Sequence, residues 1–207
     1  MDYKEFDKLG AKNTEPKSSC NLCKEAKSKV GSKAGYGAIV YKIGDIKTGW
    51  FATLSPRTGG NPKADFTIQL MPLRHLTHFS QIHSYPKLAE NFGIAFSKIC
   101  KAISSVLMQE EGLMASTEEK RLSMPLAAYG KCTTWKEKKE HLHIKIFPFR
   151  GNIGQPYTVD SSFERKEVFK EKGTGKEFVK MIHVRKVMID TKRFNKLARE
   201  LIMLLKD

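Results

Sequence analysis

Apolar residues recur at helical spacing over residues 87–109. Successive members of the series lie three or four positions apart, and they are Leu88, Phe92, Phe96, Ile99, Ile103 and Leu107. Residues at this spacing share one side of an α-helix and form a continuous apolar stripe. The pattern therefore predicts one long helix that buries the stripe.

Alternation with a period of two predicts strands on both sides of this helix. Strands are expected at residues 36–43 and 49–54, joined by a turn at Gly44-Asp45, and at 65–71, 126–129, 141–148 and 178–188. Turn residues predict a loop at 55–62 and a turn at 173–176. A last helix follows Asp190, with an inner face of Phe194, Leu197, Leu201 and Leu204. This order indicates an α+β fold with an antiparallel sheet, one long packed helix and a C-terminal strand–helix extension.

Length and composition narrow the class of protein. The chain has 207 residues, 40% of them hydrophobic, which supports a domain with a core. No apolar run reaches the roughly 18–20 residues of a membrane span, and residues 1–10 lack the apolar region of a secretory signal. The four cysteines are too few for a disulfide scaffold. We therefore expect a soluble, cytoplasmic protein without a membrane partner, whose cysteines are thiols or metal ligands.

The charge is strongly unbalanced. The chain has 37 Lys and Arg against 22 Asp and Glu, a formal net charge of +15. Such an excess favours partners that carry phosphate, whether nucleotide, nucleic acid or anionic lipid. Alternatively, a lysine-rich surface only keeps the protein soluble.

The segment His141-Leu142-His143-Ile144-Lys145-Ile146 carries the clearest candidate chemistry. Side chains alternate between the two faces of a strand, so two imidazoles and one ammonium share a face while the apolar residues face the core. A neutral imidazole is nucleophilic near neutral pH and forms phosphoramidates. Alternatively, this is only the solvated face of an amphipathic strand.

Residues 141–148, HLHIKIFP, resemble the signature of the histidine-triad (HIT) family, in which histidines alternate with apolar residues. Upstream, Pro72, Arg74 and His75 followed by Phe79 resemble the family's segment after its third strand, and residues 51–55 resemble its nucleoside-contacting strand. The resemblance covers residues 20–152. It leaves a polar N-terminal arm, 1–19, and a basic extension, 153–207, that we expect to pack on the domain.

The resemblance implies a HIT-like nucleotide hydrolase or nucleotidyltransferase. His143, at the middle position, would be the nucleophile that attacks a nucleotide phosphate and becomes a nucleotidyl-histidine. Lys145 stands where hydrolases have His and transferases usually have Gln, so hydrolysis and transfer both stay open; its ammonium would neutralise phosphoryl charge. Ser55, Arg150 and Asn152 are the expected substrate-binding residues. The partner is then a nucleotide or nucleotide conjugate. The alternative is a catalytically silent nucleotide- or nucleic-acid-binding protein that keeps the fold.

A metal site is also implied. Cys20-x-x-Cys23 has the spacing of half a zinc site. In metal-binding branches of the family, as in the uridylyltransferases, such cysteines join the His after the third strand and the first His of the triad, here His75 and His141. The resemblance thus implies a structural zinc ion with four ligands, and His78 is an alternative to His75. Otherwise the cysteines are two incidental thiols on a flexible arm.

Other residues have structural interpretations. Trp50 is expected in the core and Phe51 either there or in a nucleoside pocket, while Cys100 and Cys132 are expected to pack and His83 and His183 to lie on the surface. Because members of the family are often dimers, a homodimer is a candidate assembly. The basic extension serves either as an amphipathic cap, which its apolar helix face favours, or as a nucleic-acid surface.

Overall fold

The computed structural model describes residues 16, 19–58, 61–110, 126–131, 141–148, 165–175, 177–182 and 187–206. Nearly all of the predicted N-terminal arm lies outside these ranges. So do four residues singled out in the sequence: Cys132, Arg150, Asn152 and His183.

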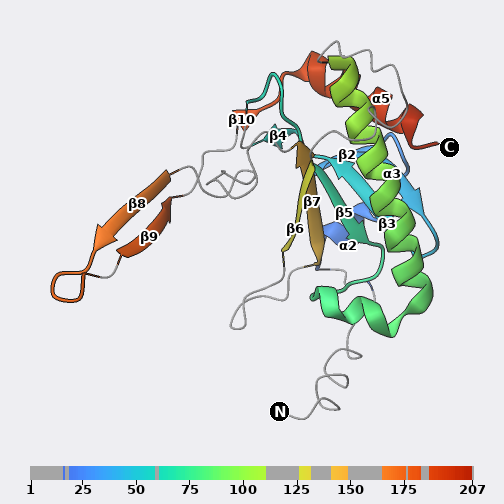
Figure 1. Cartoon of the computed structure of the whole chain (residues 1–207). Helices are drawn as coiled ribbons and strands as arrows, with labels where there is room; N and C mark the ends of the chain where they lie inside the picture. Colours follow the sequence, from blue (N-terminus) through green and yellow to red (C-terminus); the bar gives the residue numbers. More distant parts are fainter. Residues whose placement is uncertain are drawn as a thin grey trace.

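A six-stranded sheet with the order β1-β2-β3-β5-β7-β6 forms the centre of the fold, and every neighbouring pair is antiparallel (Figure 1). Its strands are β1 (Lys33–Ala34), β2 (Gly37–Ile43), β3 (Trp50–Leu54), β5 (Ile68–Pro72), β6 (Leu126–Lys131) and β7 (His143–Pro148). The predicted hairpin is confirmed: Gly44 has φ 72° in its turn, and Asp45 Oδ1 accepts hydrogen bonds from the amides of Lys47 and Thr48. The sheet confirms the α+β class.

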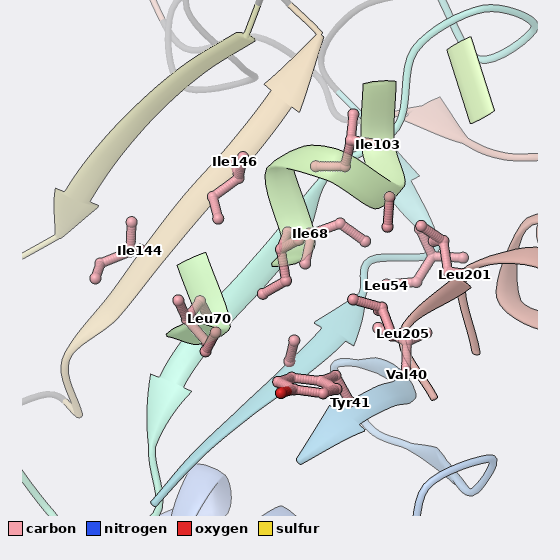
Figure 2. Packing of buried hydrophobic residues seen from close by; sticks show 14 of the residues in the cluster. Val40, Tyr41, Leu54, Ile68, Leu70, Ile103, Ile144, Ile146, Leu201 and Leu205 are labelled. Carbon is pink, nitrogen blue, oxygen red and sulfur yellow. The ribbon is translucent and has the colours of Figure 1, made fainter. Parts of the chain in front are cut away.

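Two helices cover one face of this sheet. The predicted long helix is α3 (Pro86–Glu110), and α5 (Thr191–Leu204) packs beside it and against β2 (Figure 1). Of the apolar stripe, Leu88, Ile99, Ile103 and Leu107 are buried, and Phe92 and Phe96 are half-buried at its margin. Figure 2 shows Leu54, Ile68, Leu70, Ile144 and Ile146 of the sheet meeting Ile103 and Leu201 of the helices. Trp50 is in this core, as expected, and its indole N–H donates to the Leu88 carbonyl at 2.8 Å.

The C-terminal helix corrects one predicted core residue. Phe194, Leu197 and Leu201 are buried as expected, but Leu204 is 39% exposed and Leu205 is 3% exposed. Steps of three and of four residues from Leu201 both stay near the inner side of a helix, so spacing does not distinguish these two adjacent leucines and packing decides which one is buried. The helix begins where predicted, with the Asp190 carboxylate accepting from the amides of Lys192 and Arg193.

The predicted strand at 178–188 is two strands in different sheets. β9 (Glu177–Ile182) pairs with β8 (Arg165–Lys170), which the sequence did not predict, and residues 171–175 form the expected turn. β10 (Val187–Met188) pairs with β4 (Arg57–Thr58), inside the predicted loop at 55–62. Two-residue pairings are too short for an alternation pattern, so the sequence could not reveal them.

The opposite face of the sheet carries a smaller apolar cluster. Leu22 and Ala26, from and just after the short helix α2 (Asn21–Glu25), pack against Phe51, Met71 and Leu73. Side chains alternate along β3, and this explains why its residues belong to two different clusters. Trp50, Ala52 and Leu54 face α3, whereas Phe51 faces α2. Among the described helices, none is long and apolar enough to cross a membrane.

Candidate metal centre and reactive strand

Helix α2 brings the two cysteines together. Cys20 is its N-cap residue and Cys23 lies one turn later, so both side chains point to the same side. Cys23 is buried and Cys20 is half-buried. The cysteines are therefore not on a flexible arm but at the junction between α2 and the sheet.

Two histidines meet the cysteines from neighbouring strands. His75 follows the end of β5, and His141 lies two residues before β7. The amide of Leu142 donates to the Leu76 carbonyl at 2.7 Å and holds these two segments side by side. Both imidazoles are 2% exposed, and their rings meet edge to face with centroids 5.1 Å apart.

Each imidazole directs Nδ1 at a thiol. The distance from Cys23 Sγ to Nδ1 is 3.4 Å for His75 and 3.3 Å for His141, and Cys20 Sγ lies 3.6 Å from His141 Nδ1. The four candidate ligand atoms all lie within 4.8 Å of one another, so they could bind a metal ion. This is the set that the sequence predicted; His78 is not in it, and its amide instead donates to the Gln81 side chain at 3.0 Å.

The surroundings of His141 suit a metal ligand. Its Nε2 lies 2.8 Å from the Pro72 carbonyl, which can only accept, so Nε2 carries the proton and Nδ1 has the lone pair. Such an outer hydrogen bond is usual for metal-binding histidines. Burial lowers the pKa of His141 to about 4, aided by the nearby His75 and His143 and opposed by the hydrogen bond to Pro72. The imidazole is thus neutral at physiological pH.

The predicted reactive residues His143 and Lys145 lie on β7, the strand that follows His141. Ile144 and Ile146 belong to the core under α3, so alternation directs His143 and Lys145 to the face on which α2 packs. His143 is half-buried and its Nδ1 lies 3.1 Å from the His141 carbonyl. Because a carbonyl can only accept, that contact places the proton on Nδ1, so the lone pair of the neutral ring is on Nε2.

Lys145 is more buried than the sequence suggested, at 6% exposure. On one side its cross-strand partner is Gln69 of β5, whose own partner is Thr53 of β3. Directly opposed residues in a sheet have side chains on the same face, about 4.5–5.5 Å apart at Cβ. Thr53, Gln69 and Lys145 therefore form a polar row across the face that bears His143.

Sequence reasoning missed Thr53 and Gln69 as members of this row. Alternation within residues 49–54 and 65–71 could assign each of them to a face, but only the strand register makes them neighbours of Lys145. Thr53 is fully buried, and among the described residues its hydroxyl has no hydrogen-bond partner.

The remaining predicted substrate contacts are placed as follows. Ser55 is buried just after β3, where its hydroxyl donates to the Arg57 carbonyl at 2.8 Å and accepts from the Arg57 amide at 3.2 Å. Phe51 is fully buried in the cluster with α2, in agreement with the core alternative. Arg150 and Asn152 lie outside the described residues.

Two residues with structural interpretations are placed as expected. Cys100 is half-buried against the core, and His83, in the 3₁₀ helix η1 (Phe79–Ser84), is exposed.

The chain matches no family model, and neither a curated protein nor a solved structure matches it.

Proposed function

We propose that the protein is a HIT-like enzyme that cleaves or transfers a nucleotide phosphate through a covalent intermediate on His143. Nε2 forms a bond to the phosphorus, and the bond from phosphorus to the bridging oxygen breaks, with its electron pair leaving on that oxygen. Water, or the phosphate of an acceptor, then attacks the phosphorus, and the P–N bond breaks to regenerate the imidazole. With water as acceptor, the extra proton passes to solvent.

The hydrogen bond from His143 Nδ1 to the His141 carbonyl carries the proposal. It orients the ring and selects the tautomer in which Nε2 has the lone pair that a nucleophile needs. His143 is also half-buried rather than sealed in the core, as a residue that receives a substrate phosphate must be. The alternation of β7 sends the neighbouring ammonium of Lys145 to the same face, where its positive charge would stabilise a phosphoryl group in transfer.

We infer that the four-residue centre binds zinc as a structural ion. In a tetrahedral site with Zn–S of about 2.3 Å and Zn–N of about 2.05 Å, sulfur and nitrogen ligands lie about 3.6 Å apart. The three distances from sulfur to Nδ1, at 3.3, 3.4 and 3.6 Å, are close to this spacing. A site filled by four protein ligands is closed, so zinc would hold α2 and the segments around His75 and His141 together without taking part in the reaction.

The adduct is the test of this function. The full-length, zinc-loaded protein is mixed with a dinucleoside polyphosphate, quenched, and analysed by intact mass and peptide mapping under non-acidic conditions, because phosphoramidates are acid-labile. We expect a nucleotidyl mass increase on residue 143, lost in His143→Ala and retained in the matched variant His83→Ala. An adduct that persists in His143→Ala would overturn the assignment.

The second candidate, a catalytically silent binding protein, is favoured by the departure from the triad at Lys145. It predicts nucleotide binding with no adduct in the native protein. The variant Lys145→His separates the two: a native enzyme tuned for transfer should gain hydrolysis, whereas a silent protein whose site lacks other parts should gain none.

A further inference from the structure

Outside the reactive strand, the strongest unexplained feature is a cluster of exposed lysines beside α2. Lys24, Lys27, Lys29 and Lys33 are all exposed, and they lie on α2, the loop after it and β1. We call these four residues with Tyr36 the α2–β1 basic surface. Tyr36 lies in the turn between β1 and β2 and is 46% exposed.

The fold separates charges in this region. Glu25 is the only acidic residue between positions 19 and 44, and its side chain is buried. Its Oε1 accepts from the Tyr36 amide at 2.8 Å, so the carboxylate fixes the turn of Tyr36 against α2. The lysines consequently point outward while the one acid points inward.

Hydrogen bonds fix the backbone of the α2–β1 basic surface to the neighbouring strand β2. Lys42 of β2 donates through Nζ to the carbonyls of Ala26 and Ser28, the second at 2.9 Å. The Gly31 amide donates to Ile39 at 2.8 Å, and the Ile39 amide donates to Ser32 at 3.0 Å. These bonds attach residues 26–32 to the edge of the sheet, so that the backbone bearing the exposed lysines is held in place beside Tyr36.

We propose that the α2–β1 basic surface binds single-stranded nucleic acid. The four ammonium groups attract the phosphates of a strand, and the exposed aromatic ring of Tyr36 offers a base a stacking partner. This is the usual combination in sequence-independent binding of single strands. A duplex presents phosphates but no free base face, and an anionic membrane presents neither a regular phosphate spacing nor bases. Binding here does not depend on chemistry at His143.

The test compares two sets of four charge removals in the zinc-loaded full chain. Affinity for a fluorescent oligothymidylate of about 12 nucleotides is measured by anisotropy over a range of salt concentrations. The test variant carries Lys→Gln at positions 24, 27, 29 and 33. The control removes four exposed positive charges from α5 and its end, at Lys192, Lys196, Arg199 and Lys206.

We expect the test variant to bind at least tenfold more weakly at about 0.1 M salt. The slope of log affinity against log salt concentration should also be shallower for the test variant. Each phosphate contact with a single strand contributes about 0.7 to this slope, so the loss of four contacts should reduce it by up to about 3. The control should bind within about twofold of the native protein. Zinc content and thermal unfolding confirm that each variant is folded; a test variant that does not fold is replaced by its four single substitutions, whose losses should each exceed those at the α5 positions.

Tyr36 distinguishes the partner. Tyr36→Ala should weaken binding at least about fivefold and Tyr36→Phe should preserve it, as a stacking ring requires. The proposal is overturned if both lysine sets weaken binding equally, or if inorganic polyphosphate or phosphatidylserine vesicles compete as well as the oligonucleotide. It is also overturned if a duplex binds as tightly or if Tyr36→Ala has no effect.

Discussion

Removal of the proposed zinc ion should unfold α2 locally and leave the core of the sheet intact. Leu22 and Ala26 are the apolar anchors of α2, and Leu22 is only half-buried. Their burial contributes about 2–3 kcal/mol. Ordering the backbone of residues 20–26 costs on the order of 7–14 kcal/mol, at about 1–2 kcal/mol per residue. The bonds from Lys42 and to Glu25 recover about 1 kcal/mol each, so several kcal/mol are still missing.

Zinc binding of the strength seen in zinc-finger peptides, about 10–16 kcal/mol, exceeds this deficit. Without the ion, or in Cys23→Ser, we therefore expect amide exchange to accelerate at least about 100-fold at Lys24, Ala26 and Ser28. These amides are protected in the structure by the carbonyls of Cys20, Leu22 and Glu25.

Hydrogen exchange with mass spectrometry measures this before and after dialysis against a chelator. The amides of β3 and α3 serve as internal references, because both elements lie in the main core. Cys100→Ala, a cysteine outside the cluster, should retain zinc and the protection of α2. The reasoning is refuted if α2 keeps its protection without metal, or if β3 and α3 lose theirs to the same extent.

Three further substitutions test the fold by urea unfolding. Leu197→Ala removes a fully buried side chain of α5 and should lower the free energy of unfolding by about 2–5 kcal/mol, while the exposed Met203→Ala should change it by less than about 0.5 kcal/mol. Asp190→Ala removes the N-cap of the same helix and should lower it by about 1 kcal/mol, with Asp190→Asn losing less. Trp50→Phe leaves the buried Leu88 carbonyl without its side-chain donor and should lower it by about 1–3 kcal/mol; an unchanged midpoint would show that this bond is not needed.

The sequence predicted most of the main sheet and both long helices, because in each of these elements the apolar residues recur with a regular period over many positions. Residues 87–109 and 141–148 are of this kind, and the structure places α3 and β7 there. β4 and β10 have only two residues each, too few to show a period, and the two strands lie far apart in sequence. Leu204 was misassigned because two adjacent leucines near a helix end are equally apolar, and only packing decides which one is buried.

The spacing of the cysteines and the family resemblance predicted the candidate metal ligands, but they did not predict the polar row of Thr53, Gln69 and Lys145. Cys20 and Cys23 are one helical turn apart, a local relation that a sequence contains. The neighbours of Lys145 depend on the register of β3, β5 and β7, which is set by contacts among three separate segments. Local chemistry can therefore be read from a sequence, but the set of side chains facing a substrate requires the register.

One short segment joins the proposed metal and reactive sites, and the geometry gives each residue in it a separate task. His141 uses Nδ1 toward the thiols and Nε2 toward the Pro72 carbonyl, so both ring nitrogens are engaged. Its backbone carbonyl is still available, and it is this atom that accepts from His143 Nδ1. A metal bound by the side chain of His141 would thus fix the carbonyl that selects the reactive tautomer of His143. Because the link runs through the backbone, the proposed structural ion could position the proposed nucleophile without touching the substrate.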